Sequence, residues 1–222
     1  MTTVGLIGSG KIGGTVAKLA VAAGHPVILS NSRGPDTLAE LAGQLGPLAH
    51  AGTGQEAAEG GDLVVVTIPL RAFRKVDPGP LAGKVVIDTC NYYPQRDGQI
   101  PELDSGALTS SELIQRHLAP AALVKVFNNI FYKHLESLSR PAGAPDRSYL
   151  PIAGDDTQAK AAVTAFLDSI GYGAIDAGPL AESWRQQPDT PAYGAPYGSF
   201  RDERGTPASA GAIRQALAAA AR

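Results

Sequence analysis

The chain has 222 residues, of which 44% are hydrophobic and 18% charged, and its formal net charge at pH 7 is −2. This composition excludes an intrinsically disordered chain, and the near-neutral charge excludes the basic surface by which proteins bind nucleic acid or anionic membranes. With one cysteine, four scattered histidines and no apolar stretch near the roughly 20 residues of a membrane span, we expect a cytoplasmic protein without a disulfide, a metal site, a membrane segment or a nucleic-acid partner.

Apolar runs alternate with segments of helical periodicity along most of the chain. The apolar runs lack the polar alternation of a half-exposed strand, which is typical of parallel strands covered on both faces. In chain order, we expect a strand at 4–7, a helix at 11–23, a strand at 26–30, a helix at 36–44, strands at 62–67 and 84–88, a helix at 111–117, strands at 123–127 and 149–153, a helix at 156–170 and a strand at 173–176.

These elements predict an α/β fold, a Rossmann-like doubly wound parallel sheet with right-handed crossovers, over residues 1–180. Beyond Pro179 the sequence becomes rich in proline, glycine and tyrosine, and the tail at 208–222 is alanine-rich and helical by propensity. We expect residues 181–222 to form an irregular Pro/Tyr-rich and alanine-rich C-terminal extension that lies on another surface. That surface is either its own subunit or a second one, and a homodimer is the expected assembly.

A glycine-rich loop joins the first strand to the first helix. Its sequence, Gly8-Ser9-Gly10-Lys11-Ile12-Gly13, is the G-x-G-x-x-G pattern that binds dinucleotides when it lies between a strand and a helix. Gly8 would permit the tight turn, Gly10 would let the backbone approach the pyrophosphate, and Gly13 would let the helix pack on the strand. The free N–H groups at the start of the helix favour phosphate. A glycine-rich turn without a ligand is the alternative.

The end of the second strand predicts which dinucleotide is bound. NAD-binding folds place an Asp or Glu there, roughly 20 residues beyond the glycines, to bind the ribose hydroxyls. Here the segment reads Asn31-Ser32-Arg33, with no carboxylate before Asp36. A hydroxyl and a guanidinium would bind the 2′-phosphate of NADP, which a carboxylate would repel. We therefore expect NADP(H), with a helix cap at Ser32 and a solvated Arg33 as the alternative.

Three later loops follow strands and are expected at the same edge of the sheet. Thr67-Ile68-Pro69 and Asn91 follow the strands at 62–67 and 84–88, where dinucleotide folds hold the cofactor outside the strand ends. Asn129 and Ile130 follow the strand at 123–127. If a helix begins there, Asn129 and Lys133 lie one turn apart and would hold a substrate oxygen and deliver a proton. A solvated Lys133 on a surface helix is the alternative.

These motifs, in this order, resemble the F-420:NADP oxidoreductase family, the NADPH-dependent reductases of the deazaflavin coenzyme F-420. The resemblance covers roughly residues 3–182. It rests on Gly8–Gly13, Ser32-Arg33, Thr67-Ile68-Pro69, Ile130, Gly154-Asp155-Asp156 and Asp176-Ala177-Gly178-Pro179-Leu180. The resemblance implies that Ser32 and Arg33 hold the 2′-phosphate, and that Ile130 lies between the nicotinamide and deazaflavin rings during direct hydride transfer between nicotinamide C4 and deazaflavin C5.

Three functions stay open on the sequence alone. In the first, the protein transfers a hydride between NADP(H) and coenzyme F-420 or a similar small-molecule acceptor, a reaction that needs positioning more than a strong acid or base. In the second, it reduces a small carbonyl or imine, which requires a proton donor and predicts an essential Lys133, Tyr132 or His134. In the third, it binds NADPH without turnover.

Overall fold

One sheet of eight strands forms the frame of the molecule, whose computed structural model describes residues 1–221. The strands are β1 (Val4–Ile7), β2 (Val27–Ser30), β3 (Ala49–Ala51), β4 (Leu63–Val66), β5 (Val85–Asp88), β6 (Ala122–Lys125), β7 (Tyr149–Gly154) and β8 (Gly173–Asp176). They lie in the order β3-β2-β1-β4-β5-β6-β7-β8. Neighbouring strands are parallel except β6 and β7, which pair antiparallel. The predicted Rossmann-like sheet is therefore confirmed, with one antiparallel pair within it.

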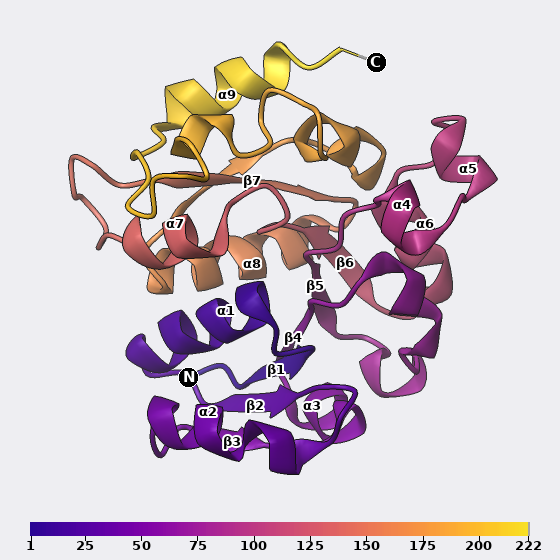
Figure 1. Cartoon of the computed structure of the whole chain (residues 1–222), viewed down its shortest axis with the longest axis vertical. Helices are drawn as coiled ribbons and strands as arrows, with labels where there is room; N and C mark the ends of the chain where they lie inside the picture. The colour runs from indigo at the N-terminus through magenta and orange to yellow at the C-terminus, as the bar shows by residue number, and fades with distance from the viewer. Residues whose placement is uncertain (222) are drawn as a thin grey trace.

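Helices cover both faces of this sheet (Figure 1). Successive strand residues point to opposite faces, so Val65 packs in the core under α1 and α8, whereas Val64 and Val66 pack in the core under α3 and α6. Both cores are apolar, which explains why the strands lack polar alternation. The helices are α1 (Lys11–Ala22), α2 (Ala39–Leu45), α3 (Gly54–Gly60), α4 (Pro94–Asp97), α5 (Pro101–Asp104), α6 (Ser110–His117), α7 (Tyr132–Ser137), α8 (Thr157–Ser169) and α9 (Ala210–Ala218).

Two elements, β3 and α3, lie in a region where the sequence analysis expects none. β3 is only three residues long, too short to show a period. α3 begins at a capping box, in which the Thr53 hydroxyl accepts from the Glu56 amide and the Glu56 carboxylate accepts from the Thr53 amide. The helix expected at 36–44 also differs, because Pro35–Leu38 forms a 3-10 turn before α2 begins.

The sixth strand ends two residues earlier than expected. β6 stops at Lys125, and Phe127 adopts a left-handed conformation with φ of 66°, which turns the chain out of the sheet. A non-glycine residue in this region carries backbone strain, and such residues concentrate at functional sites. The turn continues through Asn128 to Ile130, and α7 begins only at Tyr132.

Residues 181–221 fold back over β7 and β8, at the far end of the sheet from β3 (Figure 1). The Tyr149 amide donates to the Ala208 carbonyl, and the Tyr197 hydroxyl donates to the Tyr149 carbonyl (both 2.9 Å). Ile213 and Leu217 of α9 enter the same core as β1. The extension thus packs on its own chain, which accounts for its apolar residues, and the homodimer stays a prediction. Within residues 1–221, no helix combines the length and the apolar character that crossing a membrane requires.

Candidate active site: two cavities that meet at the glycine loop

The three glycines of the loop after β1 have different environments. Gly8 has a φ of 105°, and a Cβ on it would overlap the carbonyl oxygen of Thr67. A Cβ on Gly13 would overlap the carbonyl oxygen of Gly8, so the packing of α1 on the sheet requires both glycines. By contrast, a Cβ on Gly10 would meet no atom within 4 Å. The fold does not need a glycine there, and the open space at the N-terminus of α1 fits a pyrophosphate.

This loop borders a cavity of about 580 Å³, here called the glycine-loop cavity. It brings together the loops after β1, β2 and β4, as the sequence predicts for the carboxyl ends of parallel strands. Of the other predicted cofactor residues, Lys11, Ile12 and Asn91 line the neighbouring cavity, and Gly13 is buried. The predicted residues that line the glycine-loop cavity are Gly8, Ser9, Gly10, Asn31, Ser32, Arg33, Thr67, Ile68 and Pro69.

Asn31 shapes the rim where the 2′-phosphate is expected. Its side-chain oxygen accepts from the Arg33 amide (2.8 Å), in a turn that leaves the side chains of Ser32 and Arg33 exposed. Lys75, at the end of the 3-10 helix Leu70–Lys75, lines the same cavity. The described lining residues thus include two cations, Arg33 and Lys75, and one carboxylate, Asp77. This excess of positive charge favours binding of a phosphate over a free hydroxyl. No sequence motif points to Lys75, because it lies in an irregular segment.

A second cavity of about 560 Å³, here called the aromatic cavity, shares Gly10 and Thr67–Pro69 with the first. Lys11 and Arg96 bring positive charge to it, and no carboxylate lies among its described lining residues. Two contiguous cavities suit an extended cofactor that reaches from one into the other, together with an apolar partner in the second. The aromatic residues that line it are Tyr93, Phe127, Phe131, Tyr132, Tyr193 and Phe200.

A buried ion pair holds the loop after β5 against this cavity. The Lys125 ammonium lies 3.1 Å from the Asp88 carboxylate, and the two side chains are at most 1% exposed. Asp88 accepts from the Cys90 amide (2.7 Å), and Lys125 donates to the Cys90 carbonyl (2.5 Å). Ser110 and Ser111 of α6 complete the hydrogen bonds of the pair, as a buried charge pair requires. The ion pair therefore clamps the backbone between Thr89 and Asn91. A lysine in an otherwise apolar strand was the only sequence signal for it.

Burial also decides the state of Cys90. The side chain is 2% exposed, and burial, followed by the nearby Asp88 carboxylate, raises the pKa of its thiol well above the usual range. A protonated thiol is a poor nucleophile, so Cys90 lines the cavity as a small apolar group.

Three side-chain amides join the loop after β5 to the turn after β6 and to the extension. The Asn91 amide donates to the Asn128 carbonyl (2.7 Å), and the Asn128 amide donates to the carbonyl of Gln186 (2.8 Å). The Gln186 amide returns a hydrogen bond to the Asn128 side chain (3.0 Å). Asn91 therefore lines the aromatic cavity with an amide that already serves this network.

The expected pairing of Asn129 with Lys133 on one helical face is wrong. α7 begins at Tyr132, so Asn129 lies in the preceding turn, where its amide donates to the Ala192 carbonyl (2.8 Å). Lys133 forms an ion pair with Glu203 and lines neither of the two cavities. The structure thus brings Asn129 to the aromatic cavity and leaves Lys133 outside it.

Ile130 lines the aromatic cavity and is 6% exposed, and its place between two rings stays a prediction. Tyr93 and Tyr193 line the same cavity, and their hydroxyls lie 2.6 Å apart. Burial, followed by the hydrogen bond to Tyr93, raises the pKa of Tyr193, so this phenol stays protonated near neutral pH. The two residues are a hundred positions apart, and no sequence pattern joins them.

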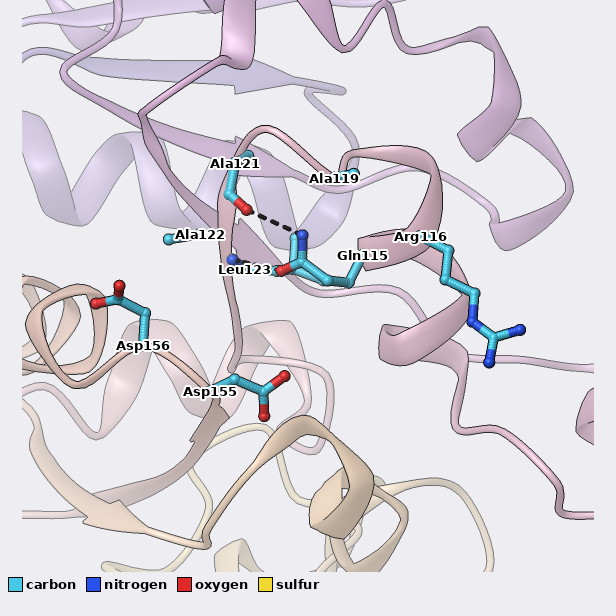
Figure 2. A pocket seen from close by; sticks show the side chains of 8 residues that line it. All are labelled: Gln115, Arg116, Ala119, Ala121, Ala122, Leu123, Asp155 and Asp156. Atoms are coloured by element: carbon cyan, nitrogen blue, oxygen red, sulfur yellow. Dashed lines mark hydrogen bonds between the residues drawn. The ribbon is translucent and has the colours of Figure 1, made fainter.

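A third cavity, of about 460 Å³, lies where β6 begins (Figure 2) and shares no lining residue with the other two. Asp156 accepts from the Ala159 amide (2.8 Å) and caps α8, and Asp155 accepts from the Leu180 amide (2.9 Å). The Gln115 side chain bonds backbone groups of β6 and of the loop before it. These polar groups hold the junction between α6 and α8, and none of the predicted site residues lies there.

Residues 3–92 match the family model described as NADP oxidoreductase, coenzyme F-420-dependent. The matched segment contains the glycine loop, Asn31–Arg33, Thr67–Pro69 and Asn91, and it ends before the turn after β6. The predicted resemblance is therefore confirmed over residues 3–92, where the chain is similar to NADP oxidoreductases.

Solved structures resemble the chain over most of its length. A hypothetical protein from Sinorhizobium meliloti is 27% identical, with a TM-score of 0.74, covering 85% of this chain and 91% of its own. A candidate F-420-dependent NADP reductase from Arthrobacter sp. FB24 is 26% identical, with a TM-score of 0.69, covering 82% of this chain and 87% of its own. The 3-hydroxyisobutyrate dehydrogenase of Mycobacterium tuberculosis, at 15% identity and a TM-score of 0.60, shares the fold, over 82% of this chain and 56% of its own.

Among curated proteins, YjhV of Escherichia coli is 38% identical over 53 residues. The match covers 24% of this chain and 39% of the length of that protein.

Proposed function

Because residues 3–92 match NADP oxidoreductases that depend on coenzyme F-420, we propose that this protein transfers a hydride between NADP(H) and a planar acceptor of the deazaflavin type. The observation that carries the proposal is the junction of the two cavities at Gly10 and Thr67–Pro69. On one side lie groups that suit phosphates, and on the other lies an aromatic cavity without a carboxylate among its described lining residues. When bound, NADPH supplies the hydride.

The residues of the chain would act mainly by positioning. Gly10 and the N-terminus of α1 would hold the pyrophosphate, and Ser32 and Arg33, with Lys75, would hold the 2′-phosphate. Ile130 would set the approach of the two rings, and the aromatic side chains would exclude water. A delocalised acceptor can take its proton from solvent, so this reaction needs no dedicated acid among the lining residues.

One feature favours a second function, the reduction of a small carbonyl or imine. That reaction localises charge on one atom and needs a positioned proton donor. Lys133 lies outside the cavity and His134 is fully buried, so neither suits this role. The Tyr93–Tyr193 pair does suit it, because the two hydroxyls lie 2.6 Å apart on residues that line the aromatic cavity, and burial raises the pKa of Tyr193.

NADPH oxidation with parallel acceptors tests both functions. Coenzyme F-420, flavins, ferric chelates, aldehydes and cyclic imines would each be offered to the wild type, to Tyr93→Phe and to Tyr193→Phe. The proposed function predicts turnover with the deazaflavin and changes of less than about tenfold in both variants. Turnover with aldehydes or imines only, lost by about 10²–10⁴-fold in either variant, would establish the second function instead.

A further inference from the structure

Phe200 is an unusually exposed aromatic side chain. It is 52% exposed, and Met1 is the only other large apolar side chain that is exposed among residues 1–221. Phe200 lines the aromatic cavity, yet it belongs to the extension and lies outside the segment that matches the family model. A large apolar side chain that stays uncovered at a cavity wall is typical of a ligand contact.

The ring of Phe200 is held by its surroundings on several sides. His134 stacks against it with ring centroids 6.5 Å apart and an interplanar angle of 25°. Phe131 and Tyr193 contact it at steep angles, with centroids 5.6 and 6.4 Å away. A Cβ on Gly194 would overlap the ring, so the glycine lets the backbone approach the ring closely. The ring therefore has a defined place beside the cavity.

The segment that carries Phe200 is tied to α7 by polar contacts. The Nε2 of His134 donates to the Asp202 carbonyl (2.5 Å), and the Ser137 hydroxyl donates to the Arg204 carbonyl (2.7 Å). Lys133 adds its ion pair with Glu203. These contacts order a segment that buries little apolar surface of its own. These contacts fix the position of the Phe200 ring at the aromatic cavity, as a ligand-binding role would require.

We propose that Phe200 is the platform on which the acceptor ring stacks, so that the C-terminal extension selects a planar acceptor. This inference rests on the proposed function, because it concerns the acceptor of the same site. Aromatic rings attract one another in offset or edge arrangements beyond the effect of buried area, whereas a small carbonyl compound has no face to stack. The extension would thus provide selectivity that the Rossmann-like sheet does not.

Binding of a planar ring to the protein saturated with NADP⁺ tests the platform without requiring turnover. The probes are FMN and oxidised coenzyme F-420, followed by fluorescence titration in the wild type, Phe200→Ala, Phe200→Trp and the control Arg201→Ala. Arg201 is an exposed neighbour that lines neither of the two cavities. We expect ring affinity to fall about tenfold in Phe200→Ala and to be retained in Phe200→Trp and Arg201→Ala, with NADP⁺ affinity unchanged.

Equal ring affinity in the wild type and Phe200→Ala would overturn the inference, as would a wild type that binds neither ring. Circular dichroism and thermal unfolding would show that each variant is folded, which is expected for a half-exposed side chain. Hydride transfer is measured separately on the same protein preparations, with NADPH in place of NADP⁺ so that a hydride donor is present. A protein that binds the ring through Phe200 and never reduces it would refute the proposed function and still support the platform.

Discussion

The glycine-loop cavity and the aromatic cavity are built in different ways. The first takes most of its walls from the turns after β1, β2 and β4, where backbone conformation and short motifs decide the contacts. The second joins the loops after β4, β5 and β6 to the extension, through hydrogen bonds between residues far apart in the chain and through the ring contacts of Phe200. The glycine-loop cavity, which is the proposed cofactor side, is therefore constrained by backbone geometry. The aromatic cavity, which is the proposed acceptor side, depends on packing between distant segments and can change without altering the cofactor side.

Gly10→Val is expected to have the largest effect, through the loss of cofactor binding. The valine side chain would occupy the space that the pyrophosphate needs, while its Cβ meets no protein atom within 4 Å. We expect NADPH affinity, measured by titration, to fall more than about a hundredfold, since several charge-assisted hydrogen bonds are lost, with thermal unfolding near that of the wild type. Gly43→Val in α2 is the matched control, because a Cβ there also meets no atom. Normal NADPH binding by Gly10→Val would mean that the loop is only a structural turn.

Arg33→Ala is expected to weaken NADPH binding by about 1–3 kcal/mol, the range of a charge-assisted hydrogen bond, while NADH binding changes little. Lys75→Ala should act in the same direction, because Lys75 lines the same cavity. Titrations of both variants with NADPH and NADH measure the difference. Equal losses for the two cofactors would show that neither cation binds the 2′-phosphate.

Ile130→Ala tests the role of the aromatic cavity in hydride transfer. We expect the hydride-transfer rate to fall about tenfold in single-turnover measurements, because a smaller side chain leaves the approach of the two rings less constrained. The side chain is 6% exposed and belongs to the main core, so unfolding should cost about 2–4 kcal/mol less. NADPH affinity should stay close to that of the wild type. A large loss of NADPH affinity with an unchanged transfer rate would contradict the position assigned to Ile130.

Lys133→Ala is expected to have the smallest effect, a fall in kcat of less than about tenfold. The hydrogen bond that the Lys133 ammonium donates to the Glu203 carboxylate raises the pKa of Lys133 and keeps it charged, and Lys133 lines neither cavity. Glu203→Gln should reproduce the same small change, because it removes the same ion pair. A loss of about a thousandfold in Lys133→Ala, with NADPH affinity unchanged, would favour the carbonyl or imine reductase.

Local sequence was sufficient to predict which residues form the glycine-loop cavity, because each structural requirement there acts over a few residues. The roles expected of Gly8 and Gly13 agree with the overlap that a Cβ would cause, and Asn31–Arg33 lies at the end of β2 as the strand pattern predicts. The strand and helix pattern was also sufficient for the sheet, because apolar runs covered on both faces have few other ways to pack.

Only the tertiary structure decided the acceptor side. The left-handed Phe127 ends β6 early and separates Asn129 from the helix that carries Lys133. The hydrophobic periodicity of the sequence does not predict this turn. Tyr193 and Phe200 reach the cavity only because the extension packs over β7 and β8 on its own chain, although its sequence suits a second subunit equally well. The sequence by itself determined the sheet, the glycine loop and the residues at the end of β2 that favour NADP, since short-range backbone geometry and charge govern them. Contacts between distant segments depend on the packing of the whole core, so the walls of the aromatic cavity emerged only with the fold.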